Sequence, residues 1–200
     1  MRRSRTGVAV LGIIAVAVSA FATVAVARPF FGTRGDDVIN GTDRRDYIAG
    51  RLGNDTLNGF GRGDVISGGW GNDTVNAGDG NDLVFAGPND DTVSGELGND
   101  RIFAQRGVDN VNGGPGNDDL WALARADVTR QPDEPADTLS GGPGNDVFHV
   151  RDGEADHVYC GEDYDVVRAD YKDVVANDCE LVKRRGGRPK SHTENDDQNR

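Results

Sequence analysis

The sequence predicts an all-β repeat fold, and three observations lead to this prediction. An aspartate returns every nine residues, ten times in succession, between residues 32 and 121. An aliphatic residue follows each of these aspartates by two positions, and glycines crowd the positions before it. No segment in this range has apolar residues at helical spacing over a useful length. Because chance does not hold one phase for ten periods, the stretch is a repeat array.

Each repeat is a nonapeptide in which six loop residues precede three extended residues. The pattern is Gly-Gly-x-Gly-Asn-Asp-x-U-x, where U is aliphatic, and residues 68–76 show it in full. Glycine supplies the positive φ that a tight turn needs. The x-U-x triplet alternates, so U is expected to point inward and its neighbours outward. The repeat aspartates are Asp37, Asp46, Asp55, Asp64, Asp73, Asp82, Asp91, Asp100, Asp109 and Asp118.

This pattern resembles the calcium-binding nonapeptide repeat of the RTX (haemolysin-type) proteins. The resemblance implies a right-handed parallel β-roll over residues 28–121, a solenoid in which two nonapeptides make one turn. It also implies that multiple Ca²⁺ ions are held between the loops of successive turns. The ten repeat aspartates, together with Asp146 in a later copy of the motif, are then the expected metal ligands.

Two nonapeptides per turn place residues eighteen apart on neighbouring turns, about 4.8 Å from each other. One loop edge then carries Asp37 and every second aspartate up to Asp109, and the other edge carries the series from Asp46 to Asp118. Carboxylates about 5 Å apart repel by roughly 3 kcal/mol at an effective dielectric constant of 20. Calcium takes six to eight oxygen ligands, so metal binding is expected to be part of folding.

The two edges differ at the fourth repeat position. Arg44 and Arg62 occupy it in the first two repeats of the second edge, where the later repeats have glycine. A bulky cation there would stand where a glycine carbonyl should approach the metal. We therefore expect weak or empty calcium sites around Asp46 and Asp64.

Residues 1–27 have the pattern of an export signal. Three arginines precede an apolar run, and Ala25-Val26-Ala27 matches a small-x-small cleavage site. The protein is thus expected to be secreted, with no stable membrane insertion after cleavage. The apolar run is almost long enough to span a bilayer, so an uncleaved segment would instead hold the protein at the cell surface.

The repeat phase breaks at residues 122–136, which are expected to form an excursion loop. The array resumes as an irregular continuation and C-terminal cap over residues 137–182, and residues 183–200 are expected to be a disordered basic tail. Cys160 and Cys179 are the two cysteines of the chain. A disulfide is expected in an exported protein, and two free thiols are the alternative.

One outward column of the roll is expected to be aromatic. Phe85, Phe103 and Trp121 follow one another at eighteen-residue intervals, so their side chains should stack. Either the excursion loop folds back over this column, or the column is a patch for self-association or a surface partner. The opposite sheet is expected to show a polar ladder of Thr, Asn and Ser.

The net charge of the chain and its lack of known catalytic motifs limit the functions that we expect for the protein. Residues 28–182 hold 31 acidic and 13 basic residues, a net charge of −18, which repels nucleic acid and attracts cations. The chain has no His-Glu-x-x-His or Gly-x-Ser-x-Gly motif, so we expect a calcium-binding structural or interaction module and not an enzyme. The alternatives are a polysaccharide-acting enzyme, with Asp133, Glu134 and Asp137 as loose candidates, and an RTX-type adhesin or toxin-related protein.

Overall fold

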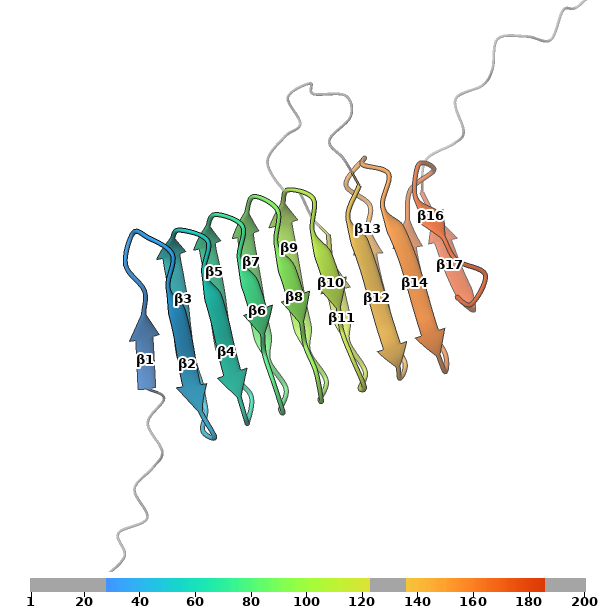
Figure 1. Ribbon diagram of the computed structural model, residues 1–200. Coiled ribbons are helices and arrows are strands. Elements are labelled where there is room, and N and C mark those ends of the chain that lie inside the picture. The colour runs from blue at the N-terminus through green and yellow to red at the C-terminus, as the bar shows by residue number, and fades with distance from the viewer. Residues whose placement is uncertain (1–27, 123–135, 186–200) are drawn as a thin grey trace, which may run out of the picture.

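The computed structural model describes residues 28–122 and 136–185 as a stack of short parallel strands. The chain alternates between two sheets that lie face to face, so each turn of the solenoid contributes one strand to each sheet (Figure 1). Within the described ranges no α-helix occurs, and consequently none that could cross a bilayer. The predicted all-β parallel solenoid is confirmed.

The first sheet contains nine strands in the order of the odd numbers. Its strands are β1 (Arg28–Phe31), β3 (Asp46–Leu52), β5 (Val65–Trp70), β7 (Leu83–Pro88), β9 (Arg101–Arg106), β11 (Asp119–Trp121), β13 (Val147–Val150), β15 (Val166–Ala169) and β17 (Leu181–Arg184). The second sheet contains eight strands in the order of the even numbers. Its strands are β2 (Val38–Thr42), β4 (Thr56–Phe60), β6 (Thr74–Asn76), β8 (Thr92–Ser94), β10 (Asn110–Asn112), β12 (Thr138–Pro143), β14 (His157–Glu162) and β16 (Val174–Val175).

The offset between paired strands is eighteen residues, which is two repeat periods. Ile48 pairs with Ile66, and Leu57 pairs with Val75, each eighteen residues on. Between β10 and β12 the offset grows to 28 residues, because Val111 pairs with Leu139. The excursion therefore leaves the stacking of the strands on either side of it unchanged.

The core is a single file of aliphatic side chains between the two sheets. The U residues expected to point inward are all buried, and most of them are fully excluded from solvent, as Ile48, Leu57 and Leu120 show. Strands with both neighbours paired and one face inward bury every second residue, which gives the alternating burial of β5 and β9. The hydrophobic core thus extends along the whole described solenoid.

The two outer faces are as different as the sequence predicts. On the even-numbered sheet, amide side chains form a ladder in which Asn58 Nδ2 donates to Asn40 Oδ1 and Asn76 Nδ2 donates to Asn58 Oδ1, both at 2.8 Å. On the odd-numbered sheet, the rings of Phe85 and Phe103 stack with centroids 5.1 Å apart, and Phe103 and Trp121 stack at 5.6 Å. The expected aromatic column is confirmed.

The column is longer than the sequence suggested. Trp121 stacks on the imidazole of His149 at 3.5 Å, and the guanidinium of Arg168 lies against the same imidazole. His149 Nε2 also lies 3.0 Å from Asp119 Oδ1. The excursion that would cover this column falls on residues 123–135, which lie outside the described residues.

The C-terminal turns are held by the expected disulfide. Cys160 in β14 is bonded to Cys179, with Cα atoms 5.2 Å apart, next to the edge strand β17. Ordered structure also extends past the boundary expected at residue 182, because Lys183 and Arg184 pair with β15. The expected signal segment (1–27) and the rest of the expected tail (186–200) lie outside the described residues.

Replacing both Cys160 and Cys179 by alanine should lower the free energy of unfolding by about 3 kcal/mol, because the 19-residue separation would no longer restrict the unfolded chain. Urea unfolding in millimolar calcium, followed by far-ultraviolet circular dichroism, measures the difference. An unchanged unfolding midpoint would show that the disulfide does not stabilise the C-terminal turns.

Candidate calcium sites

The repeat aspartates line the two loop edges of the solenoid. We call the loops that precede the even-numbered strands the upper edge and those that precede the odd-numbered strands the lower edge, as they lie in Figure 1. The upper edge carries Asp37, Asp55, Asp73, Asp91 and Asp109, and the lower edge carries Asp46, Asp64, Asp82, Asp100, Asp118 and Asp146. The division expected from the sequence is therefore the one observed.

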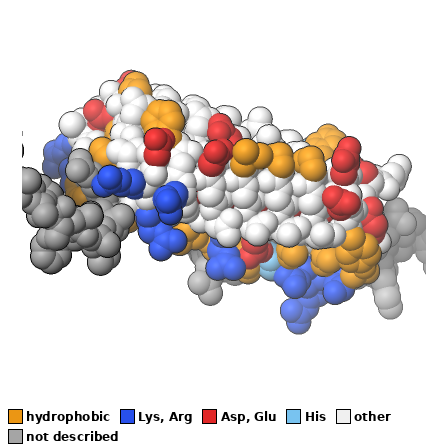
Figure 2. Space-filling view, turned by 90° about the horizontal axis from the view of Figure 1, so that it is seen from below, with side chains coloured by type: hydrophobic (Ala, Val, Ile, Leu, Met, Phe, Trp, Pro, Cys, Tyr) orange, Lys and Arg blue, Asp and Glu red, His pale blue; other side chains and the backbone are white. Residues whose placement is uncertain are grey.

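Although they are carboxylates, all of these aspartates except the half-buried Asp37 are buried. Asp64 and Asp100 are each 1% exposed, and Asp146 is fully buried. Viewed from below in Figure 2, the lower edge is mostly a white strip of backbone and uncharged side chains. The expected ligands thus lie under the loop surface and face the interior of the loops.

From Asp55 onward, one oxygen of each ladder aspartate accepts a hydrogen bond from the preceding turn. Asp55 Oδ1 accepts the backbone N–H of Asp37 at 2.8 Å, and Asp73 Oδ1 accepts that of Asp55 at the same distance. The same bond repeats on the lower edge, for example from Asp82 N–H to Asp100 Oδ1 at 2.8 Å. It crosses the excursion as well, because Asp118 N–H donates to Asp146 Oδ1. The aspartates therefore form two continuous ladders along the axis.

The other oxygen of most ladder aspartates has no hydrogen-bond partner and is sealed from solvent. These Oδ2 atoms belong to Asp55, Asp64, Asp73, Asp82, Asp91, Asp100, Asp109, Asp118, Asp146, Asp156 and Asp165. Leaving a buried acceptor unsatisfied costs about 1–3 kcal/mol, and more for a charged group. A cation that these unsatisfied oxygens coordinate would remove this cost.

Glycines leave a space in which these oxygens meet backbone carbonyls. A Cβ added at Gly50 would lie 2.2 Å from Asp55 Oδ2 and 2.5 Å from the carbonyl oxygen of Gly68. At Gly95 the same test brings Asp100 Oδ2 and the carbonyl oxygen of Gly113 each to 2.4 Å. Carboxylate and carbonyl oxygens are the ligands that calcium prefers, so the residues present fit this ion.

Burial raises the pKa of the ladder aspartates from Asp55 onward, although the backbone N–H bond opposes the shift. The pKa rises to about 6 at Asp73, to about 7 at Asp91 and to about 8 at Asp109, where neighbouring carboxylates add to the effect of burial. On the lower edge, burial raises the pKa of Asp64 and Asp100 to about 7. At neutral pH the ladders therefore resist carrying their full negative charge unless cations neutralise it.

The first rung of each ladder differs from the rest, which the sequence analysis missed. Asp37 Oδ2 accepts hydrogen bonds from Thr33 N–H at 2.6 Å and from Thr33 Oγ1 at 2.9 Å. Thr42 caps Asp46 Oδ2 in the same way, at 2.7 and 2.8 Å. A threonine four residues before the aspartate, where residues 68–73 have glycine, is the sequence signal that could have revealed this capping.

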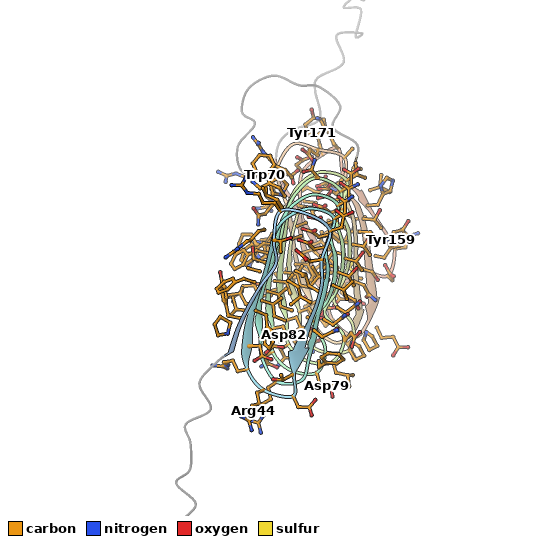
Figure 3. All side chains as sticks on the ribbon, turned by 60° about the vertical axis from the view of Figure 1, so that its left-hand side comes forward. Arg44, Trp70, Asp79, Asp82, Tyr159 and Tyr171 are labelled. Atoms are coloured by element: carbon orange, nitrogen blue, oxygen red, sulfur yellow. A yellow bond between two sulfur atoms is a disulfide. The ribbon has the colours of Figure 1, made fainter. Side chains whose placement is uncertain are left out.

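The two arginines of the lower edge do not enter the ladder. Both Arg44 and Arg62 are exposed, and Figure 3 shows Arg44 pointing away from the loops. Arg62 adopts the left-handed backbone expected of glycine, with φ 65°. Asp64 Oδ2 accordingly remains unpartnered like its neighbours, whereas Asp46 is set apart by Thr42. The weak sites expected at these two positions remain a prediction.

The ladder on the lower edge ends on a glutamate. Asp165 accepts from Asp146 N–H at 2.8 Å, and Glu180 Oε2 in turn accepts from Asp165 N–H at 2.9 Å. Of the residues considered for a polysaccharide-acting enzyme, Asp133 and Glu134 lie outside the described ranges. Asp137 is a buried rung of the upper ladder and accepts from Asp109 N–H at 2.8 Å.

Comparison with known proteins agrees with this geometry. The family model of the RTX calcium-binding nonapeptide repeat matches in four copies, at residues 31–59, 61–84, 85–120 and 136–167. These segments cover more than half of the chain. A search of the curated proteins found no match. The repeats of this family bind multiple calcium ions, and the stacked aspartates fit such binding.

Substituting Gly98 by alanine should destabilise the calcium-loaded protein by about 1–3 kcal/mol, the typical cost of a strained backbone position. Its φ is +142°, and an added Cβ would lie 1.5 Å from the carbonyl oxygen of Gly80. Gly35→Ala is the matched control, because a Cβ there meets nothing within 4 Å. Urea unfolding in calcium compares the two, and equal losses would contradict the close approach of the loops.

Acidification should favour folding of the metal-free chain. Burial raises the folded-state pKa of Asp91 to about 7 and of Asp109 to about 8, above the unfolded value of about 3.9. The folded state therefore binds these protons more tightly, and the resulting stability is lost as the pH rises from about 4 to 8. Metal-stripped protein should gain β-structure by circular dichroism when the pH falls from 8 to 5. A loss of β-structure over that range would contradict the shifts.

Proposed function

The chain belongs to the family of RTX calcium-binding nonapeptide repeat proteins, and from this premise we propose that it is a secreted module that folds when calcium binds between its loops. The rows of buried aspartate Oδ2 atoms without partners carry this proposal. A fold that leaves so many buried acceptors unsatisfied is unfavourable without metal. It becomes favourable when these oxygens coordinate a cation.

The ligands that we propose for calcium are the ladder aspartates together with glycine carbonyls of the neighbouring turn. The aspartates are Asp37, Asp46, Asp55, Asp64, Asp73, Asp82, Asp91, Asp100, Asp109, Asp118 and Asp146. We expect Asp37 and Asp46 to contribute least, because Thr33 and Thr42 already occupy their Oδ2 atoms. Calcium supplies positive charge here, while the chain positions the oxygens and excludes water from them.

Export from the cytoplasm is the second part of the proposal. The sequence of residues 1–27 has the pattern of a cleavable signal. Proteins with RTX repeats are typically extracellular, and the disulfide between Cys160 and Cys179 suits an oxidising compartment. Extracellular calcium modules work at free calcium of about 10⁻⁴–10⁻³ M, a concentration that the cytoplasm does not offer.

A role in contacting a partner is a further candidate. The column of Phe85, Phe103 and Trp121 lies on the outer face of the odd-numbered sheet, and each ring is only half-buried. A stacked, partly exposed aromatic surface is suited to a second copy of the chain or to another surface partner. The stacking of the rings favours this candidate over a polysaccharide-acting enzyme, because Asp137, the described residue among those considered for catalysis, is a buried rung of the upper ladder.

Removal of calcium tests the proposal. The chain from residue 28 onward should be largely unfolded and expanded in EGTA, and it should become compact and β-rich as calcium rises to the millimolar range. Circular dichroism and small-angle X-ray scattering follow the two changes, with magnesium as the control ion. A compact, β-rich protein in a strong chelator would overturn the proposal.

A pair of variants extends the same titration to one ligand. Asp82→Asn keeps the acceptor for Asp64 N–H but removes the charge of a carboxylate that is 3% exposed and has an unpartnered Oδ2. The exposed Asp79 lies on the same lower edge (Figure 3), and Asp79→Asn removes the same charge from the loop surface. Folding should require several-fold more calcium in the first variant and a much smaller increase in the second, because the exposed Asp79 acts on Asp82 only through its charge.

A further inference from the structure

One loop of the upper edge departs from the repeat pattern and carries extra acids. It joins β13 to β14 and reads Arg-Asp-Gly-Glu-Ala-Asp over residues 151–156. Counting back from Asp156, Glu154 stands at the fourth repeat position, which is Gly53, Gly71, Asn89 and Gly107 in earlier loops of this edge. A side-chain carboxylate is thus present where the repeat offers only a backbone carbonyl.

The acids of this loop converge on an aspartate of the preceding turn. One carboxylate oxygen each from Asp137, Glu154 and Asp156 lies within 4.8 Å of the others. Asp137 is 1% exposed and Asp156 is fully buried. Three carboxylates at this separation repel strongly when charged, because little water reaches them.

Two unsatisfied oxygens at this cluster point to a ligand, and one of them, on Asp152, lies outside the ladders. Asp156 Oδ1 accepts the N–H of Asp137 at 3.1 Å, but its Oδ2 is buried and has no hydrogen-bond partner. Asp152 repeats this arrangement at the side of the cluster. Its Oδ1 accepts from Glu154 N–H at 3.0 Å, and its Oδ2 is buried without a partner. Both free oxygens need a cation or a donor that the described residues do not provide.

The ligand atoms and the charges of the cluster indicate which kind of cation it can bind. Lys172 places an ammonium on this loop, where its Nζ donates to the carbonyl of Gly153, a backbone oxygen and not one of the carboxylates. The group contains oxygen ligands only, without histidine or cysteine, which suits a hard divalent ion and disfavours zinc or copper. Calcium fits better than magnesium, because three carboxylates can meet its higher coordination number.

We propose that Asp137, Glu154 and Asp156 bind a calcium ion through their side chains, with Asp152 beside it, at a position of the upper ladder where the repeat pattern predicts no glutamate ligand. This inference rests on the proposed function only in taking calcium as the ion. The site joins the loop before β12, where the chain re-enters the solenoid after the excursion, to the loop before β14. An ion there fastens the C-terminal turns to the ladder of the upper edge.

Counting bound calcium ions in the full chain tests the proposal. Native mass spectrometry should find one ion fewer per chain in Glu154→Gln than in the wild type, and circular dichroism in calcium should show that the remaining roll is folded. Glu162→Gln is the control, because Glu162 is an exposed glutamate at the end of β14 and the charge change is the same. The control should bind the wild-type number of ions.

A second variant covers the case in which Glu154→Gln does not fold. Glu154→Lys places a tethered ammonium beside Asp137 and Asp156, so it should fold and still bind one ion fewer. The wild-type number of ions, bound with unchanged affinity, in either folded variant would overturn the site. Failure of both variants to fold would also count against it, since the lysine supplies the charge that the ion is proposed to supply.

The wild type separates this inference from the proposed function. A wild-type chain that binds no calcium refutes the proposed function itself. A wild type that binds calcium and folds, alongside a Glu154→Gln chain with the same number of ions, refutes only the additional site.

Discussion

The structure depends on one constraint, which is that most loops bury a carboxylate with only one of its oxygens satisfied by the described residues. The bond from each aspartate N–H to the Oδ1 of the next turn fixes the spacing of the turns and aligns the ladders. That close stacking in turn favours glycine at most positions where a carbonyl of one loop passes the backbone of the next, as at Gly98. Without a cation, the arrangement that aligns the strands also concentrates negative charge that the loops cannot solvate.

Features that repeat could be predicted from the sequence, because the period itself carries the information. Eighteen-residue register, the inward aliphatic residues and the aromatic column all follow from placing two nonapeptides in each turn. The cysteine pair could be predicted because nineteen residues is close to one turn.

Features that occur once could not be predicted in this way. Thr33 and Thr42 cap the first carboxylates by local hydrogen bonds, and a periodic pattern contains no trace of them. Glu180 ends the lower ladder because its longer side chain reaches the same amide as an aspartate would, which only the folded backbone reveals. Likewise Glu154 approaches Asp137 only because the excursion restores the register after 28 residues. The ends and the interruption of the array therefore hold the information that the repeats lack.

The direction of the ladder bonds has a consequence for how such a chain assembles. Each aspartate side chain accepts from the amide of the turn before it, so the aspartate amide of every newly formed turn is satisfied only when the next turn forms. A chain that emerges from a channel amino end first would therefore always carry one unfinished turn at its growing end. The lower ladder is complete only when the final turn forms, because Glu180 then accepts from Asp165 N–H and Cys160 is bonded to Cys179. Assembly of this kind proceeds in one direction, from the amino end to the carboxyl end of the solenoid.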